Sequence, residues 1–141
     1  IIKDELLKGR LNPTEFENLI GKLLSSLGFE NISKFRGSSD KGADIVCLYN
    51  LYGIIKLRVA VQIKWYDIAK GLIGKEVVDE LLNGMMKNEC IMGCIITTGD
   101  FSDETVEYVN ELFQNENIII TLINGDKLAS IIANKGLSLI K

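Results

Sequence analysis

Two β-rich runs, residues 43–50 and 54–65, are separated only by a short segment around Asn50 and Gly53. A connection this short predicts an antiparallel hairpin, because parallel strands need a crossover of a dozen or more residues. The second run alternates apolar and more polar residues, and strand side chains point to alternate faces with period two. Gln62 and Lys64 are therefore expected on the same face of one strand.

The rest of the chain alternates helical and strand patterns. Asn12, Pro13 and Glu15 have the residue types of a helix N-cap, N1 and N3, and apolar residues then follow helical spacing as far as Gly28. Further helices are expected over 75–87, 102–115 and 126–133, strands over 29–35, 90–98 and 117–123, and a loop over 36–42.

This order of elements, α-β-β-β-α-β-α-β-α, predicts an α/β fold. An antiparallel hairpin followed by β-α-β units implies a mixed central sheet with helices on both faces. Internal repeats, low-complexity segments and Pro/Gly/Ser-rich linkers are all absent from the sequence. Residues 1–141 are therefore expected to form a single domain.

Composition excludes several classes of chemistry. The chain has no histidine, which excludes a Ser-His-Asp triad, a histidine base and histidine-built zinc sites. Its three cysteines, Cys47, Cys90 and Cys94, cannot form a four-cysteine zinc site and are expected to be buried reduced thiols. No apolar run is long enough for a transmembrane helix and no secretory signal is seen, so a cytoplasmic location is expected.

The charge is unevenly distributed along the chain. Net charge is −3, yet residues 34–75 hold eight basic and three acidic residues, whereas residues 76–141 hold four basic and eleven acidic residues. A basic middle segment on an acidic body is typical of one-sided contact with a polyanion such as DNA. A solvated charged surface is the alternative.

Asp44, Gln62 and Lys64 are the residues most suggestive of chemistry. If the hairpin pairs about Gly53, Asp44 lies opposite Gln62 with about 5.5 Å between the Cα atoms. A carboxylate, an amide oxygen and an ammonium group would then converge on one patch. Mg²⁺ prefers oxygen ligands and keeps several waters, so this set suits metal-assisted phosphodiester hydrolysis. Glu17, at the edge of the first helix, is a possible fourth member.

These residues also resemble those of a known family. The segments 40–45 (DKGADI) and 61–64 (VQIK) resemble the PD-(D/E)xK nuclease superfamily in its Mrr-type branch, where glutamine takes the usual acid position before x-Lys. Phe16-Glu17 before this motif, and the segments 96–102 (ITTGDFS) and 123–128 (INGDKL) after it, are similar to the same branch. The resemblance covers about residues 12–133 and implies a restriction-endonuclease-like fold.

The resemblance implies a role for each residue. Asp44 corresponds to the metal-binding aspartate, Gln62 to the variable acid position and second metal ligand, Lys64 to the catalytic lysine, and Glu17 to the helix acid. The implied protein is an endonuclease that cleaves DNA with Mg²⁺ or Mn²⁺. The family often carries a winged-helix DNA-reading domain, so sequence-specific recognition is expected from an additional domain or subunit.

Five residues are candidates for DNA contact. Lys34, Arg36 and Lys41 belong to the basic segment beside Asp44, and Trp65 and Tyr66 can stack on a base or sugar. Packing or interface roles are the alternative for the two aromatic residues.

Structural alternatives stand beside each assignment. Asp44 can cap a loop, Gln62 and Lys64 can form an exposed polar strand face, and Glu17 can be solvated. The sequence departs from the family pattern in two ways. Ser38 and Ser39 stand where the family often has glycine, and glutamine is a weaker metal ligand than glutamate. Two other functions stay open: a nuclease for junctions or branched DNA, which a homodimer would favour, and a nucleic-acid-binding module that no longer cuts.

Overall fold

The computed structural model describes residues 12–34, 44–65 and 71–136. They form a five-stranded sheet in the order β1-β2-β3-β4-β5. The strands are β1 (Phe29–Lys34), β2 (Ile45–Leu51), β3 (Ile55–Lys64), β4 (Met92–Thr97) and β5 (Ile119–Ile123), and the helices are α2 (Pro13–Ser26), α3 (Lys75–Lys87), α4 (Asp103–Glu116) and α5 (Gly125–Lys135). The predicted order of elements is confirmed, and the predicted loop over 36–42 lies outside the described residues.

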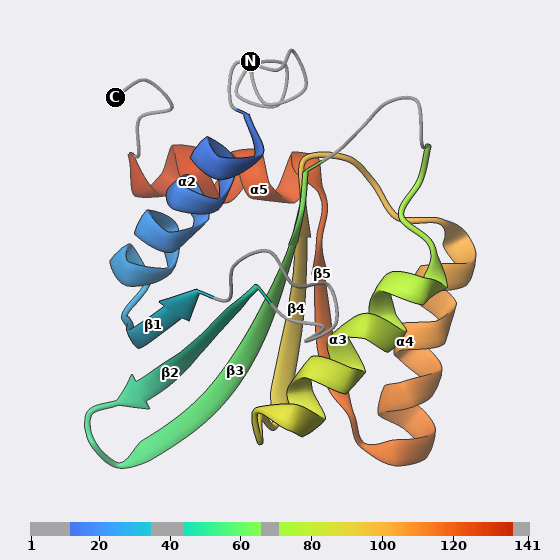
Figure 1. The fold of residues 1–141 in the computed structure, drawn as a ribbon, viewed down its shortest axis with the longest axis horizontal. Helices are drawn as coiled ribbons and strands as arrows, with labels where there is room; N and C mark the ends of the chain where they lie inside the picture. Colours follow the sequence, from blue (N-terminus) through green and yellow to red (C-terminus); the bar gives the residue numbers. More distant parts are fainter. Residues whose placement is uncertain (1–11, 35–43, 66–70, 137–141) are drawn as a thin grey trace.

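The sheet is mixed, as predicted. β1, β2 and β3 pair antiparallel, whereas β3, β4 and β5 pair parallel through the α3 and α4 crossovers. Helices α2 and α5 cover one face of the sheet, and α3 and α4 cover the other (Figure 1). The α/β class with helices on both faces is therefore confirmed.

Local signals determine where the helices begin. Asn12 caps α2, and its side-chain oxygen accepts a hydrogen bond from Glu15 N while the Glu15 carboxylate accepts one from Asn12 N. At α4 the Ser102 side chain accepts a hydrogen bond from Thr105 N, and at α5 the Asn124 side chain accepts one from Lys127 N. These caps satisfy backbone N–H groups that have no partner within the helix, and the predicted capping box is confirmed.

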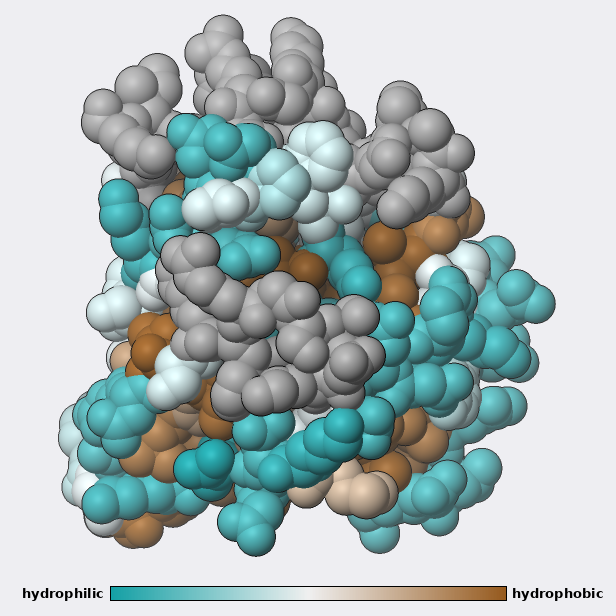
Figure 2. Space-filling model, in the orientation of Figure 1, coloured by the Kyte–Doolittle hydropathy of each residue, from teal (hydrophilic) through white to brown (hydrophobic). Residues whose placement is uncertain are grey.

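Strand β3 separates two hydrophobic cores. Val59, Val61 and Ile63 belong to the core beneath α2 and α5, whereas Ala60 belongs to the core beneath α3 and α4. The α2/α5 face also contains an apolar groove of ≈ 340 Å³, lined by residues of α2, α5 and all five strands. The outer surface in the view of Figure 2 is largely hydrophilic, with separate hydrophobic patches.

Helix α3 packs closely on the sheet because the residues beneath it are small. Ala60 of β3 pairs with Gly93 of β4, and a Cβ atom at Gly93 would overlap the side chains of Leu81 and Met85 on α3. The close approach of α3 therefore depends on glycine at this position.

The cysteines differ partly from the prediction. All three are free. Cys47 is buried, but Cys90 and Cys94 are only half-buried. Cys94 lines the α2/α5 groove, and Cys90 lies before the beginning of β4. Within the described ranges, no helix combines the length and apolar character needed to cross a membrane.

Candidate active site

The β2–β3 register places Asp44 beside the end of β3. Ile45 pairs with Val61, and the Asp44 N–H donates to the Val61 carbonyl at 3.2 Å. Asp44 is thus the next residue along the ladder and lies level with Gln62. The position predicted from the hairpin is confirmed.

The Asp44 carboxylate points to the backbone of β3. Its Oδ2 accepts a hydrogen bond from Ile63 N at 2.8 Å. Burial raises the pKa of Asp44 above its usual value, while the Ile63 N–H and Lys64 lower it and Glu80 raises it. The negative charge on this half-buried carboxylate is therefore disfavoured by its surroundings, and a bound cation would offset that cost.

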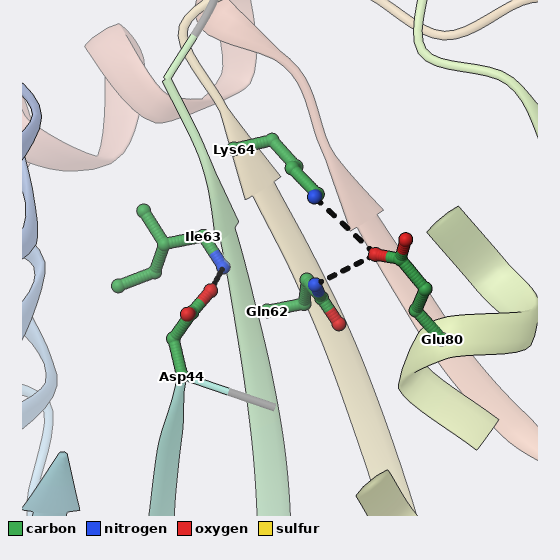
Figure 3. A network of polar contacts seen from close by, with 5 residues as sticks. All are labelled: Asp44, Gln62, Ile63, Lys64 and Glu80. Atoms are coloured by element: carbon green, nitrogen blue, oxygen red, sulfur yellow. Dashed lines mark hydrogen bonds and ion pairs between the residues drawn. The ribbon is translucent and has the colours of Figure 1, made fainter. Parts of the chain in front are cut away.

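Gln62 and Lys64 point instead to helix α3. Gln62 Nε2 donates to Glu80 Oε1 at 3.2 Å, and Lys64 Nζ lies 3.3 Å from the same oxygen. Figure 3 shows both side chains reaching Glu80 from one side of β3, with the Asp44 carboxylate on the other side of the strand. The predicted meeting of amide and ammonium groups occurs, but it occurs at Glu80 rather than at Asp44.

Gln62 leaves one polar atom without a partner. The residue is only 5% exposed, which excludes the alternative of an exposed strand face for Gln62. Its Oε1 is buried and finds no hydrogen-bond donor in the part of the chain that the structure describes. Leaving a buried acceptor unpaired costs about 1–3 kcal/mol. This oxygen is therefore a candidate ligand for a cation.

The donor set fits a hard divalent cation. Asp44 offers a carboxylate and Gln62 a buried amide oxygen, and Mg²⁺ and Mn²⁺ prefer such oxygen ligands. Among the described residues, no three acidic, cysteine or histidine side chains are gathered in one place. A cation held by only these two side chains would have to keep several waters.

Glu80 was not predicted from the sequence. It lies in α3 directly before the buried Leu81, at the edge of the face that packs on the sheet. A β-α-β crossover packs its helix back against its own strands. An acidic residue bordering the apolar stripe of 75–87 could therefore have been identified as a neighbour of β3.

The structure describes three of the other residues predicted for the site. Glu17 is half-buried on α2, which covers the sheet face opposite α3, so it does not join the group around Glu80. Lys34 ends β1, where it pairs with Ile45, and Trp65 follows β3 with 37% of its surface exposed. Arg36, Lys41 and Tyr66 lie outside the described residues.

Thr97 ends β4 beside Lys64, and Thr98 follows it. Thr97 pairs with Lys64 in the sheet, and both Thr97 and Thr98 are buried. Thr97 Oγ1 accepts a hydrogen bond from Gly99 N at 3.0 Å. Thr97 therefore stabilises the turn after β4.

Comparisons with known proteins identify a family and a similar fold. A protein family described as restriction endonuclease, of the Mrr catalytic type, matches residues 9–132. A crystal structure described as a protein of unknown function, AF1548, has the same fold, with a TM-score of 0.64 and 18% sequence identity over 88% of this chain and 67% of that chain. No curated protein matches the sequence.

Proposed function

Because the chain belongs to the Mrr-type restriction endonuclease family, whose members are DNA nucleases, we propose that it is a metal-dependent endonuclease that hydrolyses phosphodiester bonds in DNA. One observation carries the finer assignment: the buried, unpaired oxygen of Gln62 lies on the strand whose end adjoins the Asp44 carboxylate. A buried oxygen without a hydrogen-bond donor on β3 and a carboxylate at the adjoining end of β2 support cation binding at this end of the sheet.

The proposed roles follow from the chemistry of each side chain. Asp44 and Gln62 would hold Mg²⁺ or Mn²⁺, which when bound supplies a water of lowered pKa and neutralises phosphate charge. Lys64 is proposed to hold the negatively charged phosphate or to orient the attacking water. The Lys64 side chain is 33% exposed and is therefore accessible to substrate. Glu17 is proposed as a supporting acid from α2.

The proposed DNA contacts lie around the same end of the sheet. Lys34 ends β1 next to the start of β2, and Trp65 directly follows Lys64 and is partly exposed. Together with Arg36, Lys41 and Tyr66, they are proposed to bind the phosphate backbone and to stack on bases or sugars. The basic character of residues 34–75 supports this assignment.

The proposal is tested by plasmid cleavage with and without Mn²⁺. Asp44→Ala should abolish cleavage because it removes the metal-binding carboxylate, and Lys64→Ala should slow it by about 10²-fold or more. Asp103→Ala, an exposed aspartate at the start of α4, is the control and should cut normally. Wild-type cleavage by Asp44→Ala would contradict the assignment.

A nucleic-acid-binding module without cleavage is the second candidate, and one observation favours it. Lys64 and Gln62 are both engaged by Glu80, and Asp44 by the Ile63 N–H, so the polar groups partly satisfy one another. Binding of DNA by the wild-type protein, with neither Mn²⁺ binding nor cleavage of plasmid, linear or branched DNA, would establish this candidate instead.

A further inference from the structure

One carboxylate oxygen of α3 joins the two polar side chains of β3. Glu80 Oε1 accepts a hydrogen bond from Gln62 Nε2 at 3.2 Å and lies 3.3 Å from Lys64 Nζ (Figure 3). The three residues differ in exposure. Gln62 is 5% exposed, whereas the side chains of Lys64 and Glu80 are 33% and 37% exposed. The contacts therefore run from a buried amide, through Glu80, to an ammonium group that solvent can reach.

The buried amide holds the Glu80 carboxylate in place. An exposed ion pair alone restrains two long side chains only weakly, because water screens the charges and both chains lose conformational freedom. The hydrogen bond from Gln62 Nε2 is partly buried, and hydrogen bonds to charged groups are stronger than neutral ones. A carboxylate at position 62 could not make this bond, because an ionised acid only accepts hydrogen bonds. The amide of Gln62 is therefore suited to hold an acid on α3.

Helix α3 is held by its neighbours on both sides of Glu80. The preceding residue, Asp79, accepts a hydrogen bond from the hydroxyl group of Tyr108 on α4. The following residue, Leu81, is fully buried, and its side chain lies where a Cβ atom at Gly93 would overlap it. These contacts restrict the rotation of α3 about its axis and its movement along the sheet. They therefore fix where the Glu80 side chain leaves the helix.

We propose that Glu80 is a positioning residue for Lys64: held by Gln62, it fixes the Lys64 ammonium group at the place from which that group acts on the DNA phosphate or the attacking water. An ammonium group has three N–H donors, so one contact with Glu80 leaves two for substrate. Lysine has a long, flexible side chain, and fixing its Nζ beforehand lowers the entropy lost on reaching the transition state. The proposal rests on the function proposed above and adds to it a residue that acts through Lys64.

The kinetics of plasmid cleavage by Glu80→Ala with Mn²⁺ test the proposal, because position and charge affect different constants. The kcat should fall by about 10-fold or more, since a small misplacement of a reacting group can cost about 10²-fold. The KM for DNA should not rise, because the variant removes a negative charge that repels phosphate. Glu76→Ala is the matched control, since it removes the same charge from an exposed residue one turn earlier in α3. It should keep both constants within about two-fold of the wild type.

A double-mutant cycle shows through which residue Glu80 acts. Without the lysine, Glu80 has no ammonium group to position, so adding Glu80→Ala to Lys64→Ala should slow cleavage by no more than about two-fold further. Losses that multiply would show that Glu80 acts independently of Lys64 and would overturn the proposal. Alanine favours a helix and the ion pair is partly exposed. The urea unfolding midpoint of each variant should therefore stay close to that of the wild type.

The two proposals fail in different ways. If Lys64→Ala slows cleavage while Glu80→Ala cuts as fast as the wild type or faster, the positioning role is overturned and the nuclease function stands. A faster rate would show that Glu80 masks Lys64 rather than positioning it. If Asp44→Ala and Lys64→Ala both cut like the wild type, the active site is wrongly placed and both proposals fall. A wild-type protein that binds DNA without cutting it overturns both as well.

Discussion

The two faces of the central sheet perform different tasks, and β3 contributes to both. On the α2/α5 face, Val59, Val61 and Ile63 are all buried in an apolar core. On the α3/α4 face, the same strand passes from the buried Ala60 to the buried amide of Gln62 and then to the partly exposed Lys64. One strand thus provides hydrophobic burial on one side and a polar site on the other.

The two faces also differ in how closely their helices pack. The α2/α5 side retains an apolar groove of ≈ 340 Å³, whereas α3 lies so close to Gly93 that a single added methyl group would overlap it. A hydrophobic core can stabilise a fold without exact placement, but a hydrogen bond depends on a distance. Close packing is therefore found on the face where Glu80 must reach Gln62 and Lys64.

Among variants that test whether the two faces act independently, Ile63→Ala is expected to change the unfolding free energy most. Ile63 is 7% exposed in the apolar core, and loss of a buried isoleucine side chain costs about 2–5 kcal/mol of unfolding free energy. The backbone N–H that binds Asp44 is kept, so Mn²⁺ affinity should change little. Urea unfolding and calorimetry measure the two quantities. A large loss of Mn²⁺ affinity in the folded variant would show that the faces are not independent.

A smaller loss is expected from Gly93→Ala. The added methyl group meets Leu81 and Met85, and overpacking of this kind typically costs about 1–3 kcal/mol. Because the shift would move Glu80 on α3 away from Lys64 on β3, the cleavage rate of the folded variant should fall together with stability. A variant that is destabilised but cuts DNA normally would show that close packing of α3 is not what positions Glu80.

The smallest change in unfolding free energy is expected from Gln62→Leu, and this variant should be more stable rather than less stable. Leucine removes a buried oxygen that has no donor among the described residues, so the unfolding free energy should rise by about 1 kcal/mol. Mn²⁺ binding should be lost in the same variant. A decrease in stability would mean that the hydrogen bond to Glu80 outweighs the cost of the unpaired oxygen.

Most of the fold could be predicted from the sequence because its signals are local. The capping box of Asn12 and Glu15 and the short hairpin turn near Gly53 depend on residues a few positions apart. The same hairpin gave the position of Asp44 relative to Gln62. The direction of the Asp44 side chain was not predictable, since it depends on the Ile63 N–H that β2 leaves without a strand partner.

The contact of Glu80 with Gln62 and Lys64 was not predicted, for a different reason. It lies 18 residues from Gln62 in sequence, and its contact depends on how closely α3 packs, which is determined by Ala60 and Gly93 together. The half-buried state of Cys90 and Cys94 likewise depends on what covers β4 in three dimensions. Contacts of this kind follow from the packing of whole elements rather than from any local pattern.

The order of the strands in the sheet bears on how the chain is made. Each strand lies beside its predecessor in the sequence, so a chain emerging from the ribosome can add every new strand to a free edge without separating strands that have already paired. By the time α3 has emerged, Asp44, Gln62, Lys64 and Glu80 have all been synthesised, while β4 is still to come. Synthesis of β4 then provides Gly93, against which α3 can pack closely.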